Sequence, residues 1–110
     1  MPDCNLSPAT RSITKQNGTS TTELYGLTSG TCEERVPLSI VGKEIKAEAR
    51  GTAGQTVREF EIERVDEPLG QFKVLFDLST DLPVGTLRYI VDLDNETIEA
   101  STLTIVKGVT

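Results

Sequence analysis

The sequence predicts an all-β protein folded as one antiparallel β-sandwich. Three observations predict this class. Short segments alternate apolar and polar residues, turn-forming residues recur about every 8–12 positions, and no long stretch has a helical period. The chain has 110 residues, which suits one domain. We expect an extended N-terminal arm over residues 1–10, followed by a β-sandwich domain over residues 11–110.

The N-terminal quarter of the chain predicts the arm and one pair of strands. Residues 1–10 contain two prolines and no apolar period, which favours an extended arm. Residues 11–16 and 19–27 are predicted strands, the second because it is rich in threonine with an apolar centre. Asn17-Gly18 between them is typical of a tight turn.

In the middle of the chain, the segment before residue 43 has no regular pattern of apolar and polar residues, and the segment after it alternates. Residues 28–34 read as a loop because they are rich in Gly, Ser and Thr. The apolar run over residues 36–41 contains Pro37, which cannot donate to a sheet ladder, so we expect an edge segment or an irregular lead-in. Residues 43–50 alternate with period two, which predicts a strand, although their Glu, Ala and Lys content also suits a helix. Residues 51–54 (GTAG) predict a hairpin turn.

The C-terminal half alternates most clearly. We expect turns at residues 67–70 and 94–96, where turn-forming residues cluster. Residues 79–82 (STDL) read as a single capped helical turn, because Ser and Thr favour the start of a helix. The strands predicted around these turns cover residues 56–65, 71–78, 86–93 and 97–106.

The composition excludes several classes of function. The chain has no histidine, so it cannot form a Ser-His-Asp or Cys-His catalytic arrangement by itself. Only two cysteines are available as soft metal ligands, and we expect no cofactor. The net charge of −6 disfavours nucleic acid as a partner, because phosphate backbones attract clustered Lys and Arg. No window reaches the roughly 18 apolar residues of a membrane span. We therefore expect a protein that is not an enzyme.

The two cysteines, Cys4 and Cys32, match no metal-binding spacing. A chain without a signal peptide is expected in a reducing compartment, where thiols stay free. A disulfide between the arm and the loop over residues 28–34 remains the alternative, if the arm folds back onto that loop.

The densest group of carboxylates lies at the last predicted turn. Asp92, Asp94 and Glu96 resemble the first half of a calcium loop, and Glu99 follows them. The glycine and the distal bidentate glutamate of such a loop are missing. A solvated turn whose side chains bond the backbone is therefore the favoured interpretation. Paired carboxylates could also serve glycoside hydrolysis, but a chain without tryptophan offers few sugar platforms.

A second acidic stretch lies on one predicted strand. Glu59, Glu61 and Glu63 occupy alternate positions, so a strand places them on one face. The favoured interpretation is a solvated outer face, and the sharper one is an acidic docking surface for a basic partner.

Three segments resemble an immunoglobulin-like domain of bacteriophage and prophage tail modules, similar to the N-terminal domain of phage baseplate upper proteins. The first segment is residues 13–19 (ITKQNGT), a strand followed by a Gly-containing turn. The second is VPLSIVG at 36–42 with IKAEAR at 45–50, and the third is LPVGTLRYIVDL at 82–93 with STLTIV at 101–106 and the final Val109-Thr110. Lys43 stands where the family usually has an aromatic residue, and Ser101 where it often has glycine.

The resemblance implies an immunoglobulin-like antiparallel sandwich without catalytic residues. It implies a virion structural protein, made in the bacterial cytoplasm, that joins tail, baseplate, fibre or capsid subunits in several copies within a symmetric assembly. We expect the arm to act as a clamp on a partner, since flexible termini can wrap large surfaces, so Cys4, Asn5 and Leu6 are docking candidates with Glu59, Glu61 and Glu63.

Two other functions fit the same composition. A capsid decoration protein would also be a small acidic sandwich, present in far more copies than a tail component. A carbohydrate-binding module for the host surface would present aromatic rings on one face, and the chain offers only Tyr25 and Tyr89 for that purpose.

Overall fold

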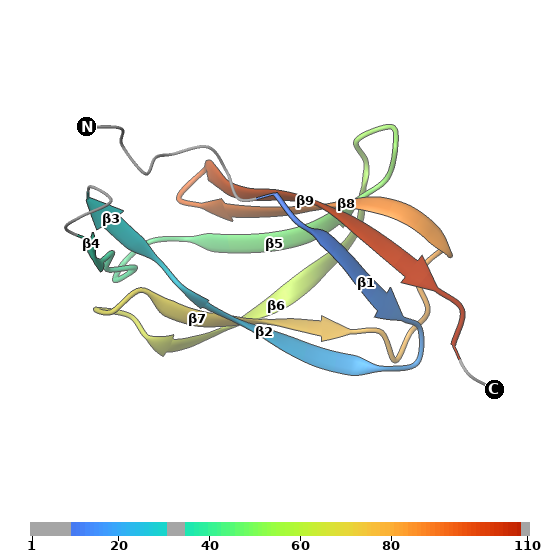
Figure 1. Ribbon diagram of the computed structural model, residues 1–110, viewed down its shortest axis with the longest axis horizontal. Coiled ribbons are helices and arrows are strands. Elements are labelled where there is room, and N and C mark those ends of the chain that lie inside the picture. The colour runs from blue at the N-terminus through green and yellow to red at the C-terminus, as the bar shows by residue number, and fades with distance from the viewer. Residues whose placement is uncertain (1–9, 31–34, 109–110) are drawn as a thin grey trace.

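The computed structural model describes residues 10–30 and 35–108 (Figure 1). The described residues form nine strands and no helix, which confirms the all-β class. No helix in this part of the chain is therefore available to cross a membrane. The strands are β1 (Ser12–Gln16), β2 (Ser20–Gly26), β3 (Thr28–Gly30), β4 (Arg35–Pro37), β5 (Ile45–Arg50), β6 (Thr56–Asp66), β7 (Gln71–Asp77), β8 (Gly85–Leu93) and β9 (Glu96–Val106).

Seven of these strands form one mixed sheet in the order β1-β9-β8-β5-β6-β7-β2, and β3 pairs with β4. Every neighbouring pair of the large sheet is antiparallel except β1 and β9, which run parallel. The expected purely antiparallel arrangement is therefore wrong at this pair. Alternation shows that a segment is a strand, but it does not show which distant strand the segment will join.

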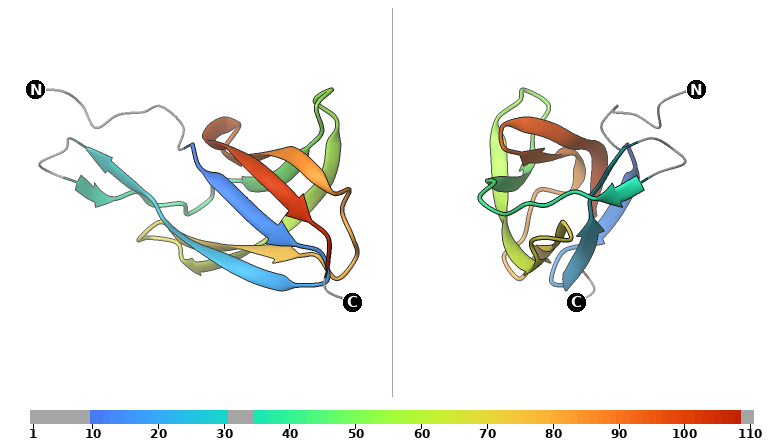
Figure 2. Two further views of the ribbon diagram at one scale, coloured as in Figure 1. Left: turned by 45° about the vertical axis from the view of Figure 1, so that its right-hand side comes forward. Right: turned by 90° about the vertical axis from the view of Figure 1, so that its left-hand side faces the viewer.

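The sheet curls because one long strand belongs to both of its halves. The first half of β6 pairs with β5, up to Phe60, and the second half pairs with β7, from Glu61 onward. The curl lays β7 and β2 opposite β8 and β9 (Figure 2). The ring centroids of Phe76 on β7 and Tyr89 on β8 are accordingly 5.1 Å apart, although the two strands are not neighbours in the sheet.

The core lies between the two halves of the curled sheet. Alternate residues of β5, β7, β8 and β9 point inward, as their period-two pattern predicts. Fully burying one large apolar side chain contributes roughly 1.5–3 kcal/mol. The largest buried apolar side chains are Tyr89, Phe72, Phe76, Ile40, Leu78, Leu103, Ile105, Val74 and Val91.

The turns are mostly where the sequence predicts them. Asp94 and Asn95 have φ values of 52° and 69°, the left-handed pair that favours a tight hairpin between β8 and β9. The expected loop over residues 28–34 is corrected in part, because Thr28–Gly30 forms strand β3. Residues 1–9 and 31–34 lie outside the described structure. The predictions for the arm and for a disulfide between Cys4 and Cys32 therefore concern residues that the structure does not describe.

The helical turn expected over residues 79–82 is wrong, because this segment contains bends and no helix. The Asp77 carboxylate accepts the Ser79 backbone N–H at 3.0 Å, which favours a turn over a helix start. Buried Asn17 then accepts the Leu82 N–H at 2.9 Å and donates to the Leu82 carbonyl at 2.8 Å. This contact from a residue distant in the sequence uses the Leu82 backbone groups that a helical turn would otherwise engage.

Candidate functional site

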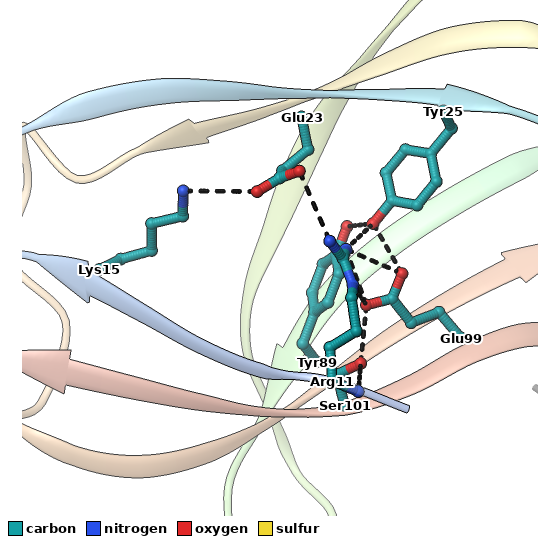
Figure 3. A network of polar contacts seen from close by, with 7 residues as sticks. All are labelled: Arg11, Lys15, Glu23, Tyr25, Tyr89, Glu99 and Ser101. Carbon is teal, nitrogen blue, oxygen red and sulfur yellow. Dashed lines mark hydrogen bonds and ion pairs between the residues drawn. The ribbon is translucent and has the colours of Figure 1, made fainter. Parts of the chain in front are cut away.

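The two ends of the large sheet meet along a seam filled with polar side chains (Figure 3). Strands β1 and β2 are the outermost strands of the sheet, and the curl brings them side by side. Glu23 on β2 joins them: its carboxylate lies 3.7 Å from the Lys15 ammonium and 3.6 Å from the Arg11 guanidinium, both on the β1 side. Ion pairs therefore connect two strands that share no ladder of backbone hydrogen bonds.

Glu99 is the centre of the polar network behind this seam. The side chain is 2% exposed, although carboxylates are rarely buried unless paired. Its Oε2 accepts hydrogen bonds from Arg11 Nε at 3.0 Å and Ser101 Oγ at 2.7 Å. Its Oε1 accepts from Arg11 Nη2 at 3.1 Å and Tyr25 Oη at 2.9 Å. Both carboxylate oxygens are thus fully partnered.

A β-bulge fixes the orientation of Glu99. The register of β8 and β9 shifts between Val91, which faces Glu99, and Asp92, which faces Thr97. The extra residue in β9 is Ile98, which packs against the core. Bulges re-aim the side chains beside them, and here Glu99 lies on the inner face of β9 together with Ser101 and Leu103.

Two tyrosines extend the network into the core. The Tyr89 hydroxyl lies 2.8 Å from the Tyr25 hydroxyl. Since Tyr25 donates to Glu99, Tyr89 is the donor to Tyr25. Burial raises the pKa of both tyrosines far above the usual value, and the hydrogen bond to Tyr25 raises the pKa of Tyr89 further. Both phenols therefore keep their protons at neutral pH and act as hydrogen-bond donors.

Arg11 stays charged within the network. Partial burial by itself lowers the pKa of its guanidinium, but the hydrogen bond and the charge of Glu99 outweigh burial and leave that pKa raised. Charge-assisted, bidentate Arg–carboxylate contacts are among the strongest hydrogen bonds in proteins. Among the described residues that are not exposed, no buried side-chain nitrogen or oxygen lacks a partner. The network is therefore suited to holding β1, β2, β8 and β9 together.

Sequence reasoning missed this network, which joins Arg11 to residues 88 positions away. One signal was present: Glu99 has the same period-two register as Ser101, Leu103 and Ile105, a face that is otherwise apolar or small. That signal predicts a buried carboxylate, but it cannot name Arg11 or Tyr25 as the partners.

The structure places the predicted acidic residues of β6 in one row. Glu59, Glu61 and Glu63 are all exposed on the outer face of this strand. None of them belongs to an ion pair among the described residues. We call these three side chains the acidic row. The other docking candidates, Cys4, Asn5 and Leu6, lie outside the described structure.

The structure does not gather the carboxylates of the β8–β9 turn around one point. Asp92 accepts a hydrogen bond from Thr97 Oγ1 at 2.7 Å, and the bulge takes Glu99 to the inner face. Asp94 and Glu96 are exposed. Within residues 10–30 and 35–108, no three acidic or cysteine side chains are placed to hold a metal ion together.

No known protein-family model matches the chain, and no curated protein matches it. The function is therefore inferred from the residues and their geometry.

Proposed function

We propose that the chain is a structural protein of a bacteriophage particle, a docking module that joins a tail, baseplate or fibre component to its neighbours. The resemblance to phage tail domains suggests the particle; it covers residues 13–19, 36–42, 45–50, 82–93 and 101–106 with Val109-Thr110. The acidic row on β6 is the single observation that carries the docking role, because three exposed carboxylates without ion pairs offer a charged surface for a partner.

The curled sheet supports the finer fold proposal, an immunoglobulin-like sandwich. The parallel β1–β9 pair departs from a purely antiparallel sandwich, but the other strands fit two facing layers. The strands divide into a β9-β8-β5 layer and a β7-β2 layer that face each other across the aromatic core. Strand β6 bridges the layers, so the two sheets of a sandwich would here be joined along one edge.

Exposed apolar side chains lie on the segments that meet at the β6–β7 turn. The β6–β7 turn contacts the segment after β4, since Ile40 N–H donates to the Glu67 carbonyl at 2.8 Å. Leu27 N–H donates to the Gly70 carbonyl at 3.0 Å, which brings the end of β2 to the same turn. We call the exposed apolar side chains of these segments the apolar end; they are Leu24, Val36, Val41, Val65 and Leu69, each between 45% and 64% exposed.

The partner that fits both the acidic row and the apolar end is another virion protein, with a strip of basic side chains beside apolar ones. Val65 lies two residues after Glu63, at the β-bulge between Arg64 and Asp66, so one partner surface could cover both. Interfaces commonly combine an apolar centre with charged residues at the rim. The partner would recur in several copies if the particle is symmetric.

A carbohydrate-binding role receives less support from the described aromatic residues. The Tyr25 ring stacks on Phe72 with centroids 4.9 Å apart, and the Arg11 guanidinium lies 5.8 Å from the same ring. Tyr89 is completely buried. Neither tyrosine presents a free face on which a sugar could stack.

The experiment that tests the particle assignment is quantitative mass spectrometry of purified phage particles from the host. We expect the chain in each particle at a small copy number set by the rotational symmetry of the tail. A copy number like that of the capsid subunits would favour capsid decoration instead. Absence of the chain from particles would overturn the assignment to the virion.

The docking surface is tested by charge removal. The triple variant Glu59→Gln, Glu61→Gln, Glu63→Gln should reduce incorporation into particles, while the purified domain keeps its melting temperature. The control, Asp81→Asn, Asp94→Asn, Glu96→Gln, removes the same charge from exposed positions elsewhere and should leave incorporation unchanged. Equal incorporation of both variants would show that the acidic row is a solvated face.

A further inference from the structure

Two arginines face each other on the outer side of the sheet, opposite the core. Arg50 on β5 and Arg88 on β8 are direct cross-strand partners, and their neighbours Ala49 and Tyr89 point into the core. Side chains in such a pair have Cβ atoms about 4.5–5.5 Å apart, and like charges in this position destabilise a sheet. This arrangement is unexpected in a chain with 17 acidic and 11 basic residues.

Only one of the two charges is compensated within the described structure. Arg50 Nε donates to Glu48 Oε1 at 2.6 Å, and a second guanidinium nitrogen forms an ion pair with the same oxygen. Thr56 Oγ1 donates to the other oxygen of Glu48 at 2.9 Å, so this carboxylate is fully engaged. Arg88 is exposed and forms no side-chain hydrogen bond or ion pair with any described residue.

Arg50 and Arg88 both line a pocket of about 450 Å³. Ile90 and Ala100 contribute an apolar wall, and Ile90 is only 6% exposed although it lies on the outer face of β8. The turn over residues 51–54 contributes another wall. The amides of Thr52 and Ala53 in this turn make no backbone hydrogen bond to a described residue, so their N–H groups remain available to an acceptor.

We propose that this pocket binds an oxyanion, either a carboxylate or a phosphate group, through Arg88 and Arg50. A guanidinium offers a planar fork of donors that matches the paired oxygens of both groups. An anion at this position would also compensate the charge of Arg88, as Glu48 compensates that of Arg50. This site is independent of the acidic row and of the proposed role in a phage particle.

The test is an NMR titration of the full chain at constant ionic strength, with inorganic phosphate in one arm and glutarate in the other. We expect saturable shifts of the Thr52 and Ala53 amides and of Arg88 Nε–H. Saturation by phosphate identifies a phosphate group as the ligand, and saturation by glutarate identifies a carboxylate. The absence of saturable shifts at these positions with both anions would overturn the proposal.

Two variants make the assignment specific. Arg88→Gln should weaken binding at least tenfold, whereas Lys107→Gln, which removes the same charge from an exposed position at the end of β9, should bind like the wild type. Unchanged affinity in Arg88→Gln would overturn the proposal.

Without added anion, Arg88→Gln should melt at the same temperature as the wild type or higher, because it removes the repulsion between Arg88 and Arg50. A lower melting temperature in that condition would contradict the unpaired state of Arg88.

Discussion

The buried carboxylate of Glu99 links, through hydrogen bonds, segments that are far apart in the sequence. Arg11, Ser101 and Tyr25 together donate four hydrogen bonds to its two oxygens. Removing the charge while keeping the shape, as in Glu99→Gln, weakens the contacts to Arg11 and places an amide N–H against other donors. Hydrogen bonds to charged groups contribute about 1.5–3 kcal/mol each, so we expect a loss of about 2 kcal/mol or more in the free energy of unfolding.

The measurement is urea denaturation, with Glu96→Gln as the matched control. Glu96 is an exposed glutamate on the same strand, and surface substitutions of this kind usually change stability by less than about 0.5 kcal/mol. Equal stabilities of the two variants would mean that the buried network contributes nothing beyond packing.

The tyrosine pair predicts a stability that depends on pH in the alkaline range. Burial raises the pKa of Tyr25 and Tyr89 in the folded state, while tyrosines in the unfolded chain titrate near about pH 10. Above that pH the unfolded state loses protons that the folded state retains. The free energy of unfolding should therefore be unaffected by these residues below about pH 10 and decrease as the pH rises further.

Phenolate absorbance can follow this titration directly, because the chain has two tyrosines and no tryptophan. We expect no ionisation of the folded protein until it unfolds. The double variant Tyr25→Phe, Tyr89→Phe should show a smaller alkaline loss of stability than the wild type. Ionisation of both phenols near about pH 10 in the folded protein would contradict the buried hydrogen-bonded pair.

At the scale of elements, the β6–β7 turn depends on one glycine. Gly70 has a φ of 70°, and a Cβ atom there would overlap the backbone carbonyl oxygen of Leu38. Gly54, in the β5–β6 turn, has a similar φ of 85° but open space around the missing Cβ. Alanine substitutions at these two glycines therefore separate the energetic cost of backbone strain from the cost of steric overlap.

We expect Gly54→Ala to cost about 1–2 kcal/mol, the typical penalty for a left-handed backbone with a side chain. Gly70→Ala should cost more, because the segment after β4 must also move away from the turn. Thermal or urea unfolding of the two variants tests this order. Equal losses would indicate that the contact between Gly70 and Leu38 adapts without strain.

The elements also differ in how well the sequence alone predicts them. Residues 71–77 and 85–93 alternate so regularly that both strands follow from the pattern alone. Residues 79–82 cannot be predicted in this way. Local capping preferences favour a helical turn there, whereas the side chain of Asn17 binds both backbone groups of Leu82. A local rule fails where a distant residue supplies the hydrogen bonds.

At the scale of the whole molecule, the seam between β1 and β2 should be the least protected part of the large sheet. Strands β5 and β8 each pair with two neighbours, whereas β1 pairs only with β9 and β2 only with β7. Surface ion pairs contribute only about 0.2–1 kcal/mol, and the partly buried Lys15–Glu23 pair is a long one, at 3.7 Å. Local opening at the seam should therefore cost less free energy than opening of the middle strands.

Hydrogen exchange measured by NMR tests this expectation. The amides of β5 and β8 should exchange most slowly, near the limit set by global unfolding. The amides of β1 and β2 should exchange faster, and Glu23→Gln should accelerate them selectively. Uniform protection across all seven strands would show that the sheet opens as one unit, with the seam as stable as a backbone ladder.

The sequence by itself determined the strands of the large sheet, most turns and the exposed position of the acidic row, because these follow from local periodicity and from the backbone preferences of glycine, asparagine and proline. It did not determine β3, which lies in an expected loop. Only the tertiary structure decided that β1 runs parallel to β9, that β6 serves both halves of the sheet, and that Arg50 faces Arg88. It also decided that Glu99 is buried with Arg11. These features depend on pairing between residues far apart in the chain, and the burial energy of the whole core selects that pairing.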